Sequence, residues 1–265
     1  MIKTYKILEA DGGIIDSAIE EIMNDLGDYL TIFKNDSGVA FIRPKYGTSS
    51  YVKYWMGVKD LNNRNSHHIQ LYNSNNELVG NDNDVNLSTY NWYDRYLTVI
   101  THKFGISLGW NIEGSAPVDP IRQPIVTWIT DRHKKKYCIY SLFGVITGSV
   151  RHHKIEDSTG TIREFLKDAN NSRTLRTTFK AADTFVQASR LYIDGMGFLD
   201  GVLTTAVAPS ITDRDTSTII SIDGTPYRML RLDSCMNENN NTELICATIP
   251  KFLFEVPLDE EEEDE

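Results

Sequence analysis

The chain has 265 residues, of which 40% are hydrophobic and 24% charged, values typical of a globular protein. Its formal net charge of −10 comes mostly from residues 259–265, which are all acidic and leave 30 Asp and Glu against 27 Lys and Arg elsewhere. A nearly neutral body argues against general nucleic-acid binding, and we expect the acidic tail to be disordered.

Cysteine usage and the first residues favour a protein of the reducing cytosol, or of a particle assembled there. Three cysteines are few, and an odd number cannot all pair within the chain, which argues against a secreted disulfide scaffold. The N-terminus reaches Glu9 and Asp11 before any apolar run, so we expect no signal peptide. The longest apolar runs, such as residues 142–146, are too short to cross a bilayer.

One amphipathic helix is predicted near the N-terminus. Apolar residues recur at spacings of four, three and four, at Ile15, Ile19, Ile22 and Leu26. Asp16 or Ser17 is expected to cap the start of this helix. Gly27 is expected to end it in the left-handed conformation. A second, shorter helix is predicted over residues 161–169.

Most of the remaining chain predicts strands joined by polar turns. Hairpins are expected around the turns at residues 35–38, 74–76 and 223–226, and two further strands at 96–100 and 104–110. The runs at residues 125–130 and 137–146 flank a basic turn. Trp110 and Trp128 lie in alternating apolar strands and are expected to be buried, with Trp92 more exposed.

These elements predict an α+β fold that is predominantly antiparallel β, either sandwich-like or barrel-like, with the two helices added. Residues 1–258 form the mostly-β globular domain. A subdivision at the proline-rich segment 113–124 stays open. We favour a loop there over a linker, because the strands on both sides look able to share a sheet.

Residues 105–109, Gly-Ile-Ser-Leu-Gly, match the nucleophile elbow of serine hydrolases. Partners for Ser107 exist in the chain order of that family, at Asp119 or Asp131 and then His152 or His153. The motif nevertheless lies inside an alternating strand pattern, and the βαβ alternation of a hydrolase fold is absent. An ordinary strand serine is therefore favoured, and no catalytic residue is assigned.

No metal or cofactor is expected. The histidines occur as the adjacent pairs His67–His68 and His152–His153. Because adjacent residues on a strand point to opposite faces, such a pair rarely supplies two ligands to one metal, and surface histidines are favoured. Residues 82–87 begin like a calcium loop, but Leu87 stands where the glycine is required. Cys235 and Cys246 lie symmetrically about a polar turn, and buried thiols are favoured over a disulfide.

One basic cluster is the candidate partner-binding site, and its members are Arg132, His133, Lys134, Lys135 and Lys136. It is either a solvated hairpin tip or a contact for phosphate or an acidic partner. The acidic tail, in the same or a neighbouring copy, is an available partner.

The sequence resembles tailed-bacteriophage virion proteins, because it is β-rich, aromatic, poor in Cys and rich in Asn, as in residues 190–195 and the Asn-rich loops. The resemblance implies a structural component of a viral particle, in a tail, neck or baseplate. Such a protein would contact other protein chains in a homo-oligomer or multi-protein assembly, with no direct nucleic acid and no membrane. It would pass from the host cytoplasm into the virion.

Two alternatives to this structural role remain open. The first is a cytosolic serine hydrolase using Ser107. The second is a carbohydrate- or protein-binding module using exposed aromatic residues, such as Tyr90, Trp92 and Tyr93.

Overall fold

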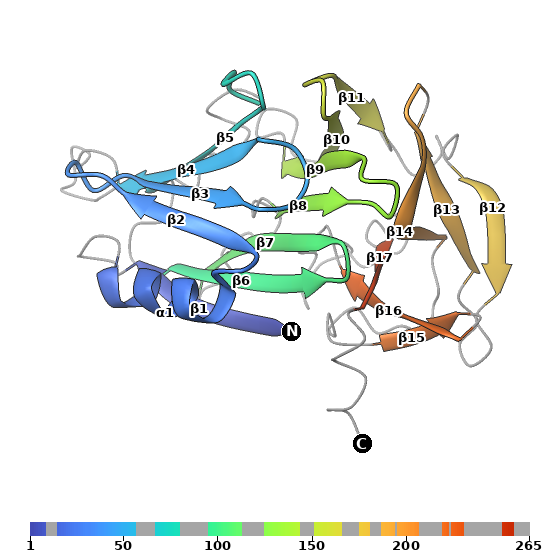
Figure 1. The fold of residues 1–265 in the computed structure, drawn as a ribbon, viewed down its shortest axis with the longest axis horizontal. Helices are drawn as coiled ribbons and strands as arrows, with labels where there is room; N and C mark the ends of the chain where they lie inside the picture. The colour runs from blue at the N-terminus through green and yellow to red at the C-terminus, as the bar shows by residue number, and fades with distance from the viewer. Residues whose placement is uncertain are drawn as a thin grey trace, which may run out of the picture.

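The computed structural model describes twelve segments of the chain, and all structural statements below concern them. They are residues 1–8, 15–56, 67–79, 95–112, 125–143, 151–165, 175–180, 187–193, 195–206, 219–222, 224–230 and 251–256. Within them the chain is β-rich, with three antiparallel sheets and one helix, α1 (Asp16–Leu26) (Figure 1).

The largest sheet, called the central sheet, has seven strands in the order β1-β6-β7-β8-β9-β10-β11. Its strands are β1 (Ile2–Leu8), β6 (Arg95–His102), β7 (Gly105–Ile112), β8 (Ile125–Thr130), β9 (Lys136–Phe143), β10 (Arg151–Asp157) and β11 (Ile162–Phe165). Strands β7 and β8, on either side of the proline-rich segment, are direct neighbours in this sheet.

Two further sheets flank the central one. The small sheet contains β2 (Leu30–Lys34), β3 (Ala40–Pro44), β4 (Tyr51–Met56) and β5 (His67–Tyr72), in chain order. The C-terminal sheet has the order β12-β13-β14-β17-β16-β15. Its strands are β12 (Leu175–Lys180), β13 (Gln187–Ile193), β14 (Gly197–Ala206), β15 (Ile219–Ile222), β16 (Thr225–Leu230) and β17 (Lys251–Glu255).

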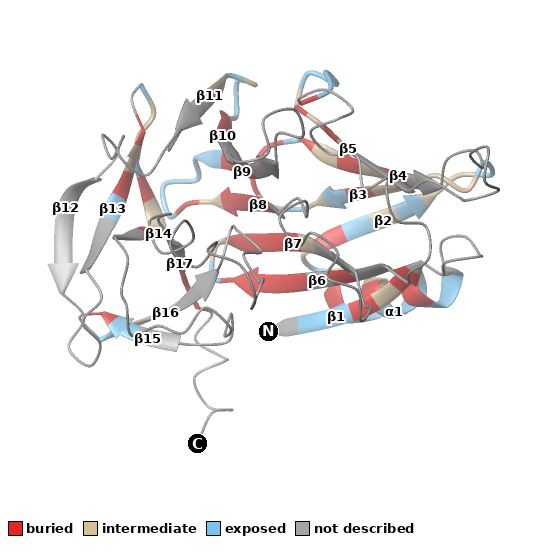
Figure 2. Cartoon of the chain, turned by 180° about the vertical axis from the view of Figure 1, so that it is seen from behind, coloured by how far each residue is buried: buried red, intermediate tan, exposed pale blue. Residues whose placement is uncertain are grey.

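Two apolar cores lie on opposite faces of the central sheet. Trp128 is fully buried in the core that the central sheet shares with the small sheet and α1. Its neighbour Ile129 lies in the other core, against the C-terminal sheet. Because neighbours along a strand point to opposite faces, the central sheet is the middle layer. Figure 2 shows the buried residues gathered along its strands β6 and β7.

Four hairpin turns share one design, in which an Asn or Asp side chain closes the turn. In each, the side-chain Oδ1 accepts hydrogen bonds from the backbone N–H groups two and four residues later, at Asn35, Asn73, Asp131 and Asp157. The residue three positions after it has a positive φ, at Gly38, Asn76, Lys134 and Gly160. Such side-chain turns explain why the hairpin positions could be predicted locally.

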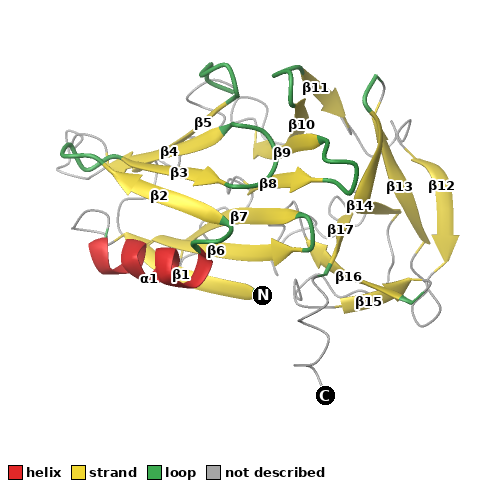
Figure 3. Ribbon diagram, viewed as in Figure 1, coloured by secondary structure: helices red, strands yellow, loops and turns green. Residues whose placement is uncertain are grey.

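Helix α1 lies along β1 and β2 (Figure 3) and buries Ala18, Ile22 and Leu26, as its apolar spacing predicts. Its ends differ from the prediction. The N-cap is Ile15, without a side-chain cap bond, and Gly27 has right-handed φ and ψ values of −58° and −20°. The start of the helix is instead held by backbone bonds, since Ile15 N–H donates to the carbonyl of Ile7 at 3.0 Å.

The predicted second helix is wrong where the structure describes it. Residues Ile162–Phe165 form strand β11, which pairs antiparallel with β10. The physical reason is the Asp157 turn, whose side chain accepts from Thr159 and Thr161 N–H and returns the chain alongside β10. Residues 166–169 of that prediction lie outside the described segments.

The other predicted strands between residues 29 and 230 are confirmed in the described segments, including both sides of the basic turn. The exception is the second arm of the hairpin around residues 74–76, which is a single bridge between Tyr72 and Leu78 and not a strand. Trp128 is fully buried, as predicted. The side chains of Trp92 and Trp110, the segment 113–124 and the acidic tail lie outside the described part of the chain.

Candidate functional site

The basic turn joins β8 to β9, and its five side chains are exposed. Asp131 organises it, because its Oδ1 accepts the N–H of His133 at 2.9 Å and of Lys135 at 2.8 Å. Lys134 occupies the left-handed position, with a φ of 62°. The turn is thus a fixed hairpin tip that presents cations.

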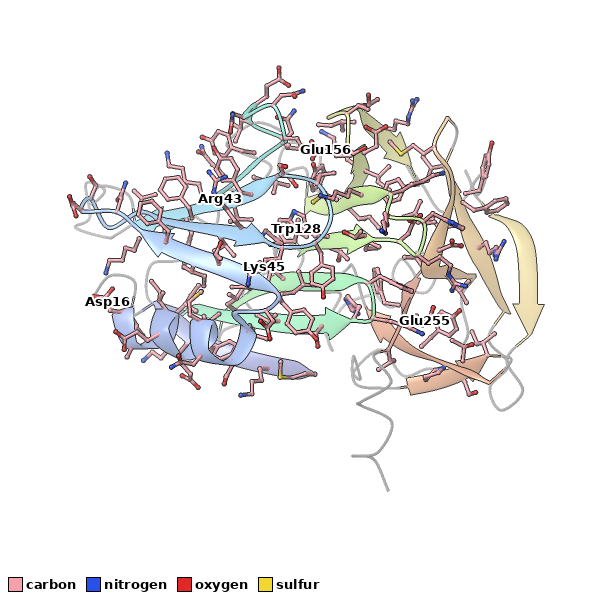
Figure 4. The ribbon with its side chains drawn as sticks, viewed as in Figure 1. Asp16, Arg43, Lys45, Trp128, Glu156 and Glu255 are labelled. Atoms are coloured by element: carbon pink, nitrogen blue, oxygen red, sulfur yellow. The ribbon has the colours of Figure 1, made fainter. Side chains whose placement is uncertain are left out.

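Two of the five basic residues are used inside the chain. Arg132 Nη2 lies 3.4 Å from Glu255 Oε2, and His133 Nε2 lies 2.9 Å from Asp200 Oδ2. Lys103 Nζ lies 2.7 Å from the other oxygen of Glu255. We call these five residues the inter-sheet charge cluster, because they join the central sheet to β14 and β17 of the C-terminal sheet. Glu255 is labelled in Figure 4.

Lys134, Lys135 and Lys136 are the remaining cations of the turn. Among the described residues, none of the three has an acidic side chain within ion-pair distance. The structure therefore divides the predicted site in two. Arg132 and His133 form ion pairs within the chain, and Lys134, Lys135 and Lys136, called the outward half, do not pair with any described acidic side chain. Burial, with the nearby carboxylates of Asp131, Asp157 and Asp200, raises the pKa of Tyr137 to about 12 at the base of the turn.

Ser107 lies within β7 and is buried, with 1% of its surface exposed. Its Oγ lies 2.7 Å from His102 Nε2 and 2.6 Å from Thr127 Oγ1. The His102 ring stacks on Phe254 of the C-terminal sheet, with centroids 4.4 Å apart. A serine–histidine pair thus exists, and it lies where the central sheet meets the C-terminal sheet. Ser107 is in the middle of a strand, whereas a nucleophile elbow needs a sharp strand-to-helix turn.

The partners suggested for Ser107 by the sequence are not the ones that the structure supplies. His102, five residues earlier, makes the contact because the tight β6–β7 hairpin brings the two strands side by side. Asp131 is engaged in the basic turn. Asp119 and the side chains of His152 and His153 lie outside the described part of the chain.

Glu156 is a fully buried carboxylate between the central and small sheets (Figure 4). It accepts hydrogen bonds from the N–H of Ser74 at 2.7 Å, from the Thr48 hydroxyl at 3.2 Å and from the Tyr140 hydroxyl. Sequence analysis missed this network. The only local signal is an acidic residue on a strand beside apolar Ile155, and its three donors come from distant segments.

A second arm of this network runs through Ser50. The indole Nε1 of Trp128 donates to the Ser50 hydroxyl at 2.8 Å, and that hydroxyl lies 2.8 Å from Thr48 Oγ1. Burial raises the pKa of the nearby Cys138 thiol, which keeps this free cysteine protonated and inert. The network therefore joins two sheets by hydrogen bonds that no local sequence pattern reveals.

Within the described segments, no group of three His, Cys, Asp or Glu side chains could hold a metal ion. The side chains of both histidine pairs, the calcium-like residues 82–87 and the pair Cys235 and Cys246 lie outside those segments. So do the aromatic candidates Tyr90, Trp92 and Tyr93. No described helix is long and apolar enough to span a membrane.

Comparisons with protein-family models, with curated proteins and with solved structures gave no match.

Proposed function

We propose that this protein is a structural component of a viral particle, in a tail, neck or baseplate, that acts through contacts with other protein chains. The outward half of the basic turn, at Lys134, Lys135 and Lys136, is the contact that we assign to this role. A partner that presents carboxylates fits it, and residues 259–265 of a neighbouring copy supply that chemistry.

The backbone of Lys134 is the observation that carries the contact assigned to these lysines, whereas the viral role itself rests on the resemblance in composition. Three turns of the same design place Gly38, Asn76 and Gly160 at this position, where a positive φ is tolerated. A lysine there costs about 1–2 kcal/mol of conformational energy. The exposed ammonium group of Lys134 makes no ion pair with a described residue that would offset this cost. Strained residues gather at binding sites, so the cost favours a role for this cation outside the chain.

The environment of the reactive side chains supports binding over catalysis. Ser107 and His102 are buried and hydrogen-bonded to each other within the central sheet, and Glu156 is buried and accepts hydrogen bonds that join this sheet to segments of the small sheet's layer. The two cores on opposite faces of the central sheet support a sandwich-like arrangement rather than a barrel-like one.

Fractionation of virus particles tests the proposal. Particles from cells that produce the protein would be separated on a density gradient, and the chain would be quantified by mass spectrometry across the fractions. We expect it to migrate with the particles at a fixed number of copies. A chain found only in the soluble fraction would rule out the viral role.

A further inference from the structure

The outward-facing side of the small sheet carries a ladder of aromatic rings. Phe33 stacks on Phe41 with centroids 5.7 Å apart, Phe41 lies 6.2 Å from Tyr51, and Tyr51 stacks on Tyr72 at 5.2 Å. These four residues, called the aromatic ladder, come from β2, β3, β4 and β5 in turn. Cross-strand register puts them side by side.

The ladder faces away from the core. The alternate residues of the same strands, such as Leu30, Ile42 and Val52, are buried against the central sheet. Phe33 is 61% exposed, the largest value among the exposed large hydrophobic residues of the described segments. A row of rings across a whole sheet is a larger apolar surface than single exposed residues make, and such surfaces mark interaction sites.

The same face is cationic. The guanidinium of Arg43 lies 4.5 Å from the ring centroid of Tyr51 and is exposed. Lys53 lies on this face as well, opposite Phe41. The four strands contain no Asp or Glu, on a chain whose net charge is −10. Figure 4 labels Arg43 on β3. Charge complementarity therefore calls for an acidic partner.

The orientation of the rings selects the class of partner. Tyr51 has Arg43 against it from β3 and Tyr72 against it from β5, so neighbours occupy the flat faces of its ring. Bases and sugars stack on the faces of aromatic rings. At Tyr51 this mode of binding is therefore blocked from within the sheet, and the exposed group beside the ring is the Arg43 guanidinium. Tyr, Phe and Arg presented in this way are typical of the centres of protein–protein interfaces.

We propose that the outer face of the small sheet is a docking surface for another protein chain, whose bound segment places a carboxylate beside an apolar or aromatic side chain. The carboxylate pairs with Arg43, and the apolar side chain covers Phe33. This inference rests on the proposed function for its premise of contacts with other chains, and it adds the surface and the chemistry of the partner.

Selection from a phage-displayed library of random linear peptides tests the proposal. Peptides enriched on the wild-type protein would be synthesised, and their affinities measured for wild type, Phe33→Ser, Arg43→Glu and the control Arg190→Glu, at an exposed arginine of β13 that lies over the Phe198 ring as Arg43 lies over Tyr51. The control makes the same charge change at an exposed cation off this face. Circular dichroism would verify that each variant folds, as the exposure of all three residues leads us to expect.

We expect the enriched peptides to share an Asp or Glu next to an aromatic or aliphatic residue. Each face variant should weaken their binding at least about tenfold, as the loss of an interface anchor does, and the control should not. Peptides without that pattern, or peptides that bind both face variants as tightly as wild type, would overturn the proposal. So would a glycan or an oligodeoxythymidine strand that binds through Phe33 when no peptide is selected.

The outcome is independent of the particle fractionation. Face-dependent peptides from a protein that is absent from particles would leave the docking surface standing and remove the viral role. A protein that migrates with particles but selects no face-dependent peptide would give the reverse result.

Discussion

The hydroxyl of Tyr140 donates a hydrogen bond to the carboxylate of Glu156, and both side chains are fully buried where the central sheet meets the small sheet. Ser74 N–H and the Thr48 hydroxyl, from segments of or next to the small sheet, donate to the same carboxylate. One acidic group thus satisfies three donors from two layers of the protein. Its removal affects more than a single bond.

We predict that Glu156→Ala lowers the free energy of unfolding by about 3–5 kcal/mol, because it leaves buried donors without an acceptor. Urea unfolding followed by tryptophan fluorescence measures this directly, since Trp128 belongs to the same network. Glu20→Ala, at an exposed glutamate of α1, is the matched control and should change stability by less than about 0.5 kcal/mol. Equal stability of the two variants would contradict the role of Glu156.

Tyr137 should make stability depend on alkaline pH. Its pKa is raised to about 12 in the folded protein, whereas an unfolded tyrosine titrates near 10. Below about pH 10 the phenol is protonated in both states, and its full contribution is present. As the pH rises toward 12 the unfolded chain loses the proton first. The free energy of unfolding should therefore fall, by up to about 2–3 kcal/mol.

The measurement for Tyr137 is urea unfolding at a series of pH values between about 9 and 12, with Tyr137→Phe in parallel. Burial also raises the pKa of Tyr5 and Tyr140, so wild type should lose stability through several groups. The difference between the two proteins isolates Tyr137. A variant whose stability falls with pH as steeply as that of wild type would show that Tyr137 does not contribute.

How far the sequence predicts this fold depends on how local each signal is. The turns at Asn35 and Asp131 could be placed because one side chain bonds the backbone two and four residues later. The second helix was wrong because Ile162 and Phe165, three residues apart, suit a helix as well as a short strand. Pairing with β10 decided between them.

The candidate site was predictable only in part, for the same reason. The basic turn is contiguous in the sequence, and its position at a hairpin tip followed from the strands on both sides. Its contacts with Asp200 and Glu255 depend on how β14 and β17 pack, which no local pattern states. The aromatic ladder likewise needs the register of three strand pairs before Phe33, Phe41, Tyr51 and Tyr72 become neighbours.

Ser107 should not react with a fluorophosphonate probe. It is buried within a strand, and its hydroxyl bonds His102 and Thr127, so a reagent has no direct approach from solvent. Incubation of the folded protein with the probe, followed by mass spectrometry, would detect a covalent adduct. An adduct on wild type that disappears in Ser107→Ala would revive the hydrolase alternative.

The last prediction separates the stability of the basic turn from its function. Lys134→Gly should raise the free energy of unfolding by about 1 kcal/mol, because glycine takes the positive φ without strain. The same change should weaken self-association or particle assembly at low salt, because it removes an outward cation. Opposite effects on stability and assembly are not expected of a residue that only closes a hairpin.

A variant with Lys134, Lys135 and Lys136 all replaced by Ser extends this test. Exposed ion pairs contribute only about 0–1 kcal/mol each. The triple variant should therefore lose more self-association than Lys134→Gly does, and its difference from wild type should shrink as salt is added. Sedimentation velocity over a range of concentrations measures self-association.

Arg132→Ser is the informative contrast, since Arg132 pairs with Glu255 inside the chain and its loss should lower stability instead. If the triple variant assembles normally but loses measurable DNA binding, the turn contacts nucleic acid and the assignment to a protein partner is wrong.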